Sequence, residues 1–453
     1  MEATQKQVFS RALLSLAIPI ALQNLVVFSA GFIDGVLAGR LGDAAISGVY
    51  MGNQPWQLLA LLTGGIDGTV LLLCSQYKGK GDKESIRKIA SLGLKISLLL
   101  GILTTIVCLC APRAVLSVLT NKREFIDTGT TYLRIACLSY PFFCITVSAV
   151  ASLRSVGRAR VGLYLSGVFL LSKLVLSFAL ARGRFGFPAL GIRGLAIATV
   201  VARILEGSLA LLYLLAIERE LALRPRHLLS YDRKMLSDMI KYGSRIMLGQ
   251  VIWAVNIFSA SAIMGRQTAE GAVAAMSVAN SLQALGYASV NGVSSALGVI
   301  TAGTVGSGNT ELMKAYARRA ERLLLILAPV SGVILFALRS LFISLYAGLS
   351  PAAVAQAGKL TAVVAITMAC ASYQIPCLFG LVKGGGDVGF VLRCDIWVVL
   401  AVVLPAGVIS SAIGAPPWVV LLCLRSDQII KCFIAAFKVR RFDWMKNLTR
   451  AAK

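Results

Sequence analysis

The sequence predicts an all-α polytopic membrane protein, with twelve transmembrane helices in two pseudo-symmetric six-helix bundles related by a parallel internal repeat. Composition is the first observation, because 57% of the 453 residues are hydrophobic and only 14% are charged, unlike an average soluble domain. The second is that apolar windows of about 20 residues, the length that crosses a bilayer, recur between short polar breaks. The third is an internal duplication.

Twelve apolar runs supply the predicted spans, and no soluble domain fits between them. The first run is too long for a signal peptide and no small-residue cleavage site follows it, so we expect it to be retained as a helix. The predicted spans are residues 12–38, 46–76, 88–111, 130–152, 160–181, 190–217, 241–264, 272–303, 317–338, 356–382, 391–412 and 415–438.

The distribution of charge decides how the net charge of +25 should be interpreted. A basic chain can bind nucleic acid, but the 45 Lys and Arg residues lie mostly in alternate loops between the apolar runs. That alternation is the positive-inside pattern of membrane proteins. It predicts a multi-pass protein of the cell (inner) membrane with both termini in the cytoplasm and no nucleic-acid partner.

The duplication appears as short matches between the two halves. Asn53 recurs as Asn280, and residues 79–84 (GKGDKE) recur as 306–311 (GSGNTE), both at an offset of 227. Gly157 matches Gly385 at an offset of 228. An offset that spans six helices keeps both copies in the same orientation, as in transporters with parallel repeats. This predicts a substrate cavity between the halves and alternating access by rocking one bundle against the other.

The repeat also sets the expected domain boundaries. We expect an N-terminal bundle at 1–217, a basic cytoplasmic linker at 218–241, a C-terminal bundle at 242–438 and a basic cytoplasmic tail at 439–453. The GKGDKE segment is too short, and wrongly placed, for a phosphate-binding glycine loop. We interpret it as a tight turn that caps two helices.

Asp34 is the first functional candidate, because it lies within the first long apolar run. A carboxylate in hydrocarbon costs several kcal/mol, so it usually faces a partner, water or a substrate path. Gly31, Gly35 and Ala38 place small residues on the same helical face, which permits close approach of another helix. The alternatives are that Asp34 lies near the outer membrane surface or holds a structural hydrogen bond.

Other charged residues inside the spans divide into explained and unexplained ones. Arg203 and Glu206 are expected to pair at i,i+3 spacing, and Lys431 is expected to extend to the cytoplasmic surface. Lys173 lies near the middle of an otherwise uncharged run, so it should have an acidic partner or a depressed pKa. Asp67 is a further acid within an apolar run.

Comparison of the halves places this chemistry in the first one. The positions that match Asp34, Asp67 and Lys173 in the second half are Ser261, Ser294 and Ala401. Charges that only one copy carries are hard to explain as a requirement of the shared scaffold. They predict cation chemistry in the N-terminal bundle.

Metal and covalent chemistry are not expected. The ten cysteines are scattered through apolar runs without a C-x-x-C pair, and the single histidine, His227, lies in a basic loop. Such cysteines are typical apolar packing residues. A membrane-embedded enzyme would need a nucleophile with a base, or a metal cluster, and neither is found. We therefore expect no enzyme activity, no cofactor and no bound metal other than Na⁺ near Asp34.

Several motifs resemble the multidrug and toxic compound extrusion (MATE) family over nearly the whole chain. They are residues 33–42 (IDGVLAGRLG), 153–158 (LRSVGR), 185–199 (FGFPALGIRGLAIAT), 384–387 (GGGD) and 393–395 (RCD). The resemblance implies twelve helices in two bundles and cation-coupled export of organic, often cationic or amphipathic, compounds. It also implies that Asp34 is the first-helix acid that couples transport to Na⁺ or H⁺.

Two stretches depart from the family pattern, one on the fifth span and one on the seventh. Similar proteins often carry Asn where this chain has Lys173, another polar or acidic residue at Ser177, and Asn-Glu where this chain has Gly249-Gln250. A neutral Gln250 cannot titrate. The expected coupling or cavity residues are Asp34, Lys173, Ser177, Thr199 and Asp67, and the expected cavity wall contains Gln250, Trp253, Asn280 and Tyr140.

The sequence thus predicts a secondary active exporter of small organic compounds, working as a monomer in the lipid bilayer with H⁺ or Na⁺ as the coupling ion. The alternative within transport is a flippase for a lipid-linked precursor, because Lys173, Arg134 and Arg203 place basic residues inside the spans. A receptor or scaffold without transport is a further alternative.

The sharpest expectation is that Lys173 supplies a built-in cation for Asp34. Two opposite charges in a low-dielectric site stabilise each other, while either alone meets a large desolvation cost. Counted along their helices, the two residues differ in depth by roughly 10 Å. The lysine stem, helix tilt and a kink at Pro19 would close much of that gap.

Overall fold

The fold is a set of long α-helices, and it confirms the all-α class expected from the sequence. The computed structural model describes residues 2–39, 43–118, 123–183, 186–224, 227, 232–265, 267, 271–344, 346 and 350–450. Within these ranges the structure contains helices and connecting turns, with an isolated β-bridge between Gly386 and Met445.

The first half of the chain folds into helices that cover the predicted apolar runs, with the first helix beginning at Glu2, ten residues before the predicted start at residue 12. They are α1 (Glu2–Gly39), α2 (Asp43–Gly52), α3 (Gln54–Lys80), α4 (Lys83–Cys110), α5 (Pro112–Ser117), α6 (Arg123–Ala136), the 3₁₀ turn η1 (Cys137–Ser139), α7 (Tyr140–Ser155), α8 (Ala159–Arg182), α9 (Ile192–Leu212) and the π-helical turn η2 (Tyr213–Ile217).

The second half repeats this plan with more interruptions. Its elements are α11 (Arg233–Gly265), α12 (Ala272–Gly306), α13 (Thr310–Ser344), α14 (Pro351–Ile375), the π-helical η3 (Pro376–Val382), α15 (Val388–Ile396), the π-helical η4 (Trp397–Val403), α16 (Leu404–Ala412), α17 (Pro417–Leu424) and α18 (Ser426–Arg441).

Eleven helices among the described residues are long and apolar enough to cross a membrane. They correspond to the first eleven predicted spans. The twelfth predicted span is present as α17 and α18, which are separated by a break at Arg425 (φ −110°, ψ 6°). The helices expected from the sequence are therefore all found, and the last one is discontinuous.

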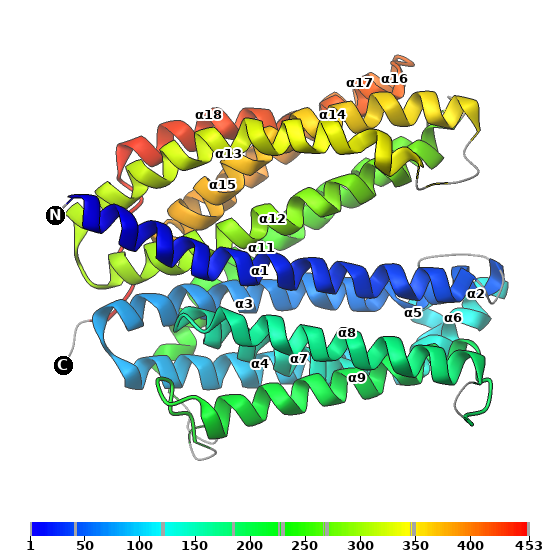
Figure 1. Cartoon of the computed structure of the whole chain (residues 1–453), viewed down its shortest axis with the longest axis horizontal. Helices are drawn as coiled ribbons and strands as arrows, with labels where there is room; N and C mark the ends of the chain where they lie inside the picture. The colour runs from blue at the N-terminus through cyan, green and yellow to red at the C-terminus, as the bar shows by residue number, and fades with distance from the viewer. Residues whose placement is uncertain are drawn as a thin grey trace. The chain divides into compact units, whose positions relative to one another are not determined.

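The helices form two compact units. The N-terminal unit comprises Leu22–Cys74 and Asp82–Met247, and the C-terminal unit comprises Met1–Ala21, Ser75–Gly81 and Leu248–Lys453. Within the N-terminal unit, α8 packs on α9 and α4 packs on α7; within the C-terminal unit, α14 packs on α12 and α13 (Figure 1).

Glycines let the ends of α3 and α12 touch inside the C-terminal unit. A Cβ added at Gly79 would overlap the backbone carbonyl of Gly303, and one at Gly306 would overlap that of Gln76. Gly79 and Gly306 are equivalent in the internal repeat. The same glycine therefore serves both copies, because only a residue without a side chain allows this backbone contact.

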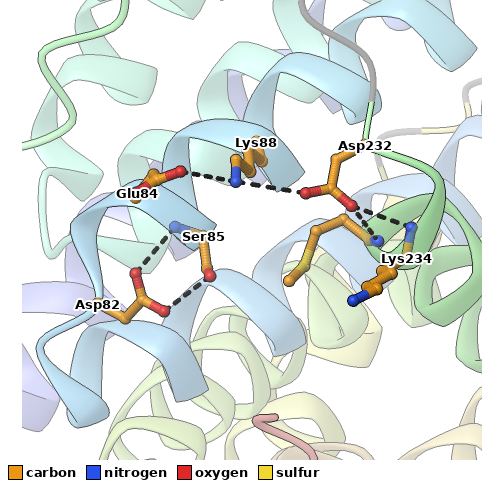
Figure 2. Close-up of polar contacts among 7 residues, drawn as sticks. Asp82, Glu84, Ser85, Lys88, Asp232 and Lys234 are labelled. Carbon is orange, nitrogen blue, oxygen red and sulfur yellow. Dashed lines mark hydrogen bonds and ion pairs between the residues drawn. The ribbon is translucent and has the colours of Figure 1, made fainter. Parts of the chain in front are cut away.

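The predicted turn at GKGDKE is confirmed, and its acid begins the next helix. Gly81 adopts a left-handed conformation (φ +81°) between α3 and α4. The Asp82 carboxylate accepts hydrogen bonds from the backbone N–H of Ser85 at 3.0 Å and from its hydroxyl at 2.7 Å (Figure 2). This is an N-cap, which satisfies backbone donors that have no partner within the helix.

The linker is shorter than expected, because α11 begins at Arg233 rather than near residue 241. Asp232 caps that helix by accepting from the N–H groups of Lys234 and Met235, at 2.9 and 3.1 Å. Lys88 on α4 lies 2.6 Å from Glu84 and 3.3 Å from Asp232 (Figure 2). The Met235 N–H, together with Lys88, holds the pKa of Asp232 below its usual value despite partial burial.

The basic tail packs against the C-terminal unit. Trp444 is fully buried, and a Cβ at Gly385 would overlap its ring. The backbone carbonyl of Lys446 accepts a hydrogen bond from the Gln76 amide at 3.2 Å, and the Leu448 N–H donates to the same amide at 2.7 Å. The described part of the tail, up to residue 450, is therefore an integral part of this unit.

Candidate functional site

The interior of the N-terminal unit holds two cations against one aromatic ring. Lys173 on α8 is 5% exposed, and its Nζ lies 5.5 Å from the centre of the Phe169 ring, one turn earlier on the same helix. The guanidinium carbon of Arg203 on α9 lies 3.7 Å from the centre of the same ring. A cation over a ring face is attracted by the ring quadrupole, and more strongly where water is excluded.

Arg203 also forms the ion pair expected from its spacing. Its guanidinium donates to Glu206 Oε2 at 2.6 Å, and both side chains are buried. The expectation of an i,i+3 pair is therefore confirmed. Because both partners come from one continuous helix, the pair neutralises itself without help from a neighbouring helix.

Asp67 on α3 belongs to a second polar group in this unit. Its carboxylate lies 4.0 Å from Arg154 on α7. Arg154 donates to the Gln23 amide oxygen at 2.7 Å, and the Gln23 amide nitrogen donates to Ser166 at 3.1 Å. These contacts join α1, α3, α7 and α8 through polar side chains, which makes Asp67 part of a network rather than an isolated acid.

The other candidates of the first half have varied surroundings. Ser177 is fully buried one turn beyond Lys173, and its hydroxyl has no hydrogen-bond partner within the described part of the chain. The Thr199 hydroxyl donates to the carbonyl of Leu195 in its own helix at 3.0 Å. Tyr140 is 2% exposed and packs in an apolar cluster. The side chain of Asp34 lies outside the described residues, so its pairing with Lys173 stays a prediction.

The three candidates of the second half lie on α11 and α12. Gln250 is half-buried, Trp253 is 44% exposed and Asn280 is exposed. All three lie in the C-terminal unit, whereas Tyr140 and the coupling candidates lie in the N-terminal unit. Their roles as cavity residues remain predictions.

Lys431 corrects the expectation drawn from its position. It does not extend to the cytoplasmic surface: it is 6% exposed, and its Nζ lies 2.6 Å from Asp395 and 3.7 Å from Asp427. Buried charge is therefore not confined to the first half. The sequence does contain a signal for this pair: Asp395 follows the start of one span, and Lys431 precedes the end of the next, by similar numbers of residues. In consecutive antiparallel helices these positions lie at a similar depth, so the two side chains can meet.

Duplicated membrane-spanning helices with ionisable side chains buried in each half define a multi-pass membrane protein of the transporter type. The MatE family model matches residues 19–179 and 246–409. The chain belongs to this family of multidrug efflux transporters. The two matches begin 227 residues apart, from 19 to 246, which is the offset that relates Asn53 to Asn280. The duplication seen in the sequence and the two copies of the model therefore coincide.

Similar proteins cover almost the whole chain. A protein of Listeria monocytogenes named "Probable multidrug resistance protein NorM" is 23% identical over 95% of this chain and 94% of its own length. The multidrug resistance protein PmpM of Pseudomonas aeruginosa is 25% identical over 95% of this chain and 92% of its own length. Neither name favours the alternative of a lipid-precursor flippase.

Solved structures show the same fold. The structure titled as the outward-facing conformation of a multidrug resistance MATE family transporter has a TM-score of 0.87 with 16% identity, covering 96% of this chain and 97% of that one. At this identity the likeness supports the twelve-helix fold alone. The family match from sequence and the fold match from structure therefore lead to the same architecture.

Proposed function

We propose that the protein is a secondary active exporter that exchanges small organic compounds, including cationic and amphipathic ones, for H⁺ or Na⁺. The observation that carries the proposal is the burial of ionisable side chains inside both copies of a duplicated set of spans. Such groups are costly in a membrane and mark ion or substrate pathways. The names of the multidrug resistance relatives support the choice of substrate class.

Coupling in the N-terminal unit is proposed to involve Asp34, with Lys173 as a built-in cation. Lys173 is buried within its span, where a charged amine needs compensation. In a protein arranged this way, Lys173 occupies the place of a coupling cation. Transport by the intact protein is then expected to depend little on Na⁺.

The remaining candidates are proposed to serve substrate passage. Gln250, Trp253, Asn280 and Tyr140 would line the path, and Ser177, Thr199 and Asp67 would adjust the polarity near the coupling site. The chain is proposed to act as a monomer with both termini in the cytoplasm, consistent with its loop charges. No covalent step is involved, so activity resides in alternating exposure of the site to the two sides.

The decisive experiment is transport in proteoliposomes with the Na⁺ and H⁺ gradients imposed separately, using ethidium as the probe. We expect ethidium movement against its gradient with the H⁺ gradient and little response to Na⁺. Liposomes with heat-inactivated protein give the leak rate. Failure of both gradients to drive any of a panel of organic cations would contradict cation-coupled export.

A substitution tests the role of Lys173 directly. Lys173→Asn removes the built-in cation while leaving a polar side chain, so we expect transport to become Na⁺-dependent. Lys173→Arg, which keeps the charge, is the matched control and should retain the Na⁺ independence of the parent protein. Equal Na⁺ dependence in all three proteins would sink the assignment.

A further inference from the structure

A buried polar cluster in the C-terminal unit is not used by the proposed coupling at Asp34. Its members come from three helical segments, and each is less than a tenth exposed. They are Gln374 on α14, Asp395 on α15, and Asp427, Gln428 and Lys431 on α18. Within predicted membrane spans, a cluster of this kind needs a reason, because each charge costs free energy to bury.

The contacts of the cluster are unequal. Lys431 Nζ lies 2.6 Å from Asp395 but 3.7 Å from Asp427, so the lysine is committed mainly to Asp395. Asp427 Oδ2 instead accepts from the Gln428 amide at 2.7 Å. The Gln428 amide oxygen in turn accepts from the Gln374 amide at 2.8 Å. Asp427 is thus the loosely held acid at one end of a chain of amides.

Two acceptor atoms of this chain have no donor among the described residues. They are Asp427 Oδ1 and the amide oxygen of Gln374, and both are buried. A buried acceptor without a donor costs roughly 1–3 kcal/mol, and more when it is charged. A proton bound to Asp427 would neutralise the charge and turn one carboxyl oxygen into a donor. Protonation of Asp427 would therefore remove the cost of burying an ionised oxygen without a donor.

The backbone is irregular at each helix that contributes to the cluster. The twelfth span breaks at Arg425, two residues before Asp427. The π-helical segment η3 begins two residues after Gln374, and η4 begins two residues after Asp395. Interrupted spans and π-turns occur preferentially at binding sites, where local rearrangement is needed. Irregular backbone here coincides with the polar side chains.

The surrounding charges favour a proton over a metal cation. Several titratable groups lie near Asp427 in the twelfth span and in two neighbouring helices. They are Arg425 and Lys431 in the same span, Asp395 and Cys394 on α15, and Tyr287 on α12. Arg425 donates to Gln283 at 2.6 Å rather than to an acid. The Lys431 ammonium lies within 4 Å of both carboxylates, so a metal ion there would meet repulsion and too few oxygen ligands, whereas a proton needs only one carboxylate oxygen.

We propose that Asp427 carries an exchangeable proton in the C-terminal unit, with Lys431 and Asp395 as positioning residues and Gln428 and Gln374 as its hydrogen-bond relay. The proposal rests on the proposed function, since proton exchange is useful to a cation-coupled exporter. It adds a proton site in the half of the chain where the charges matching Asp34, Asp67 and Lys173 are absent.

Infrared difference spectroscopy tests the site without relying on transport. The full-length protein in lipid is cycled between acidic and alkaline buffer, because a protonated carboxyl has a carbonyl band that an ionised one lacks. We expect a deuterium-sensitive acid band that is lost in Asp427→Asn. Glu206→Gln, which removes an equally buried acid of the other unit, is the matched control and should retain the band.

A second variant allows the proposal to be tested even if Asp427→Asn does not fold. Gln374→Leu keeps every charge but ends the relay, and it should shift the pH at which the band appears. Helical circular dichroism and size-exclusion profiles establish that each variant is folded. If the band is unchanged in folded Asp427→Asn, or in Gln374→Leu when Asp427→Asn does not fold, the proposal is overturned.

Transport separates this proposal from the broader one. In proteoliposomes, Asp427→Asn should lose the H⁺-driven movement of ethidium while ethidium binding persists. H⁺-driven transport that survives intact in folded Asp427→Asn would overturn the proton site and leave the exporter function standing. An acid band that depends on Asp427 in a protein that moves nothing would support the site and refute the exporter function.

Discussion

The two halves of this protein hold their buried charges in different ways. In the N-terminal unit, Arg203 pairs with Glu206 on the same continuous helix and lies over the ring of Phe169. In the C-terminal unit, Lys431 pairs across helices, with Asp395 on α15, beside a helix break. A charge compensated within one helix is insensitive to movement of its neighbours, whereas one compensated between helices changes when they shift.

This difference separates structural charge from exchangeable charge. The Arg203–Glu206 pair leaves neither Nη1 nor Oε2 without a partner, whereas Asp427 keeps a buried oxygen without one. A buried pair with complete hydrogen bonding adds rigidity, whereas a buried oxygen without a donor is costly. The Arg203–Glu206 pair and the cluster around Asp427 therefore differ in how completely their hydrogen bonds are made.

The largest effect is expected from Lys431→Met. This change removes the one base that lies within 4 Å of both Asp395 and Asp427 among the described residues. Leaving buried acids uncompensated costs about 3–5 kcal/mol. Unfolding in detergent, followed by circular dichroism in denaturant, should show this loss.

The comparison of halves supplies the control for Lys431→Met. Arg203→Met leaves one buried acid, Glu206, without its base, so it should lower the free energy of unfolding by less than Lys431→Met does. Adding Asp395→Asn to Lys431→Met should recover part of the loss, because the two sites are coupled. A greater loss from Arg203→Met than from Lys431→Met would contradict the view that the C-terminal cluster depends on its lysine.

The sequence predicted the fold well because the bilayer imposes strong local requirements. Spans follow from apolar length, and the duplication follows from matches such as Gly157 with Gly385. The pair of Arg203 and Glu206 was predictable because helical spacing fixes which residues share a face. These are all properties that a segment carries by itself.

Pairings between helices were not predictable in this way. Lys431 and Asp395 are 36 residues apart and meet only because of how α15 and α18 pack. Trp444 lies in a basic tail whose composition suggests solvent exposure, yet the tail returns to Gly385 and buries it. The positions of Lys431 and Trp444 therefore depend on packing between distant segments, which local sequence patterns do not contain.

A smaller effect is expected at Asp387, where the C-terminal unit again places an acid between two lysines. Its carboxylate lies 2.8 Å from Lys446 and 3.1 Å from Lys438. Burial opposes ionisation, but the hydrogen bonds from the two lysines hold the pKa of Asp387 below its usual value. Charged hydrogen bonds of this type contribute roughly 1.5–3 kcal/mol, so Asp387→Asn should destabilise by an amount in that range.

The pH dependence of that loss has a definite sign. Because the pKa of Asp387 is lower in the folded state, its contribution is complete above the ordinary pKa of an aspartate, about 3.9. The difference in unfolding midpoint between the parent protein and Asp387→Asn should be constant from neutral pH to about pH 5 and shrink below about pH 4. A difference that grows on acidification would contradict the contacts described for the tail.

The smallest effect is expected from Phe169→Leu, which tests the aromatic side of the comparison. The ring lies 3.7 Å from Arg203 and 5.5 Å from Lys173, so its loss weakens two buried cations at once. Together the two contacts are expected to contribute about 1–2 kcal/mol, because Lys173 Nζ at 5.5 Å lies near the outer limit of the interaction, and leucine keeps the site apolar. Phe143→Leu is the control, because among the described residues the Phe143 ring lies near one cation, Arg203 at 5.0 Å, and otherwise packs on Trp56. Thermal unfolding should show a greater loss for Phe169→Leu than for Phe143→Leu. Equal losses would mean that the Phe169 ring contributes packing alone, and that the ion pair with Glu206 compensates Arg203 without it.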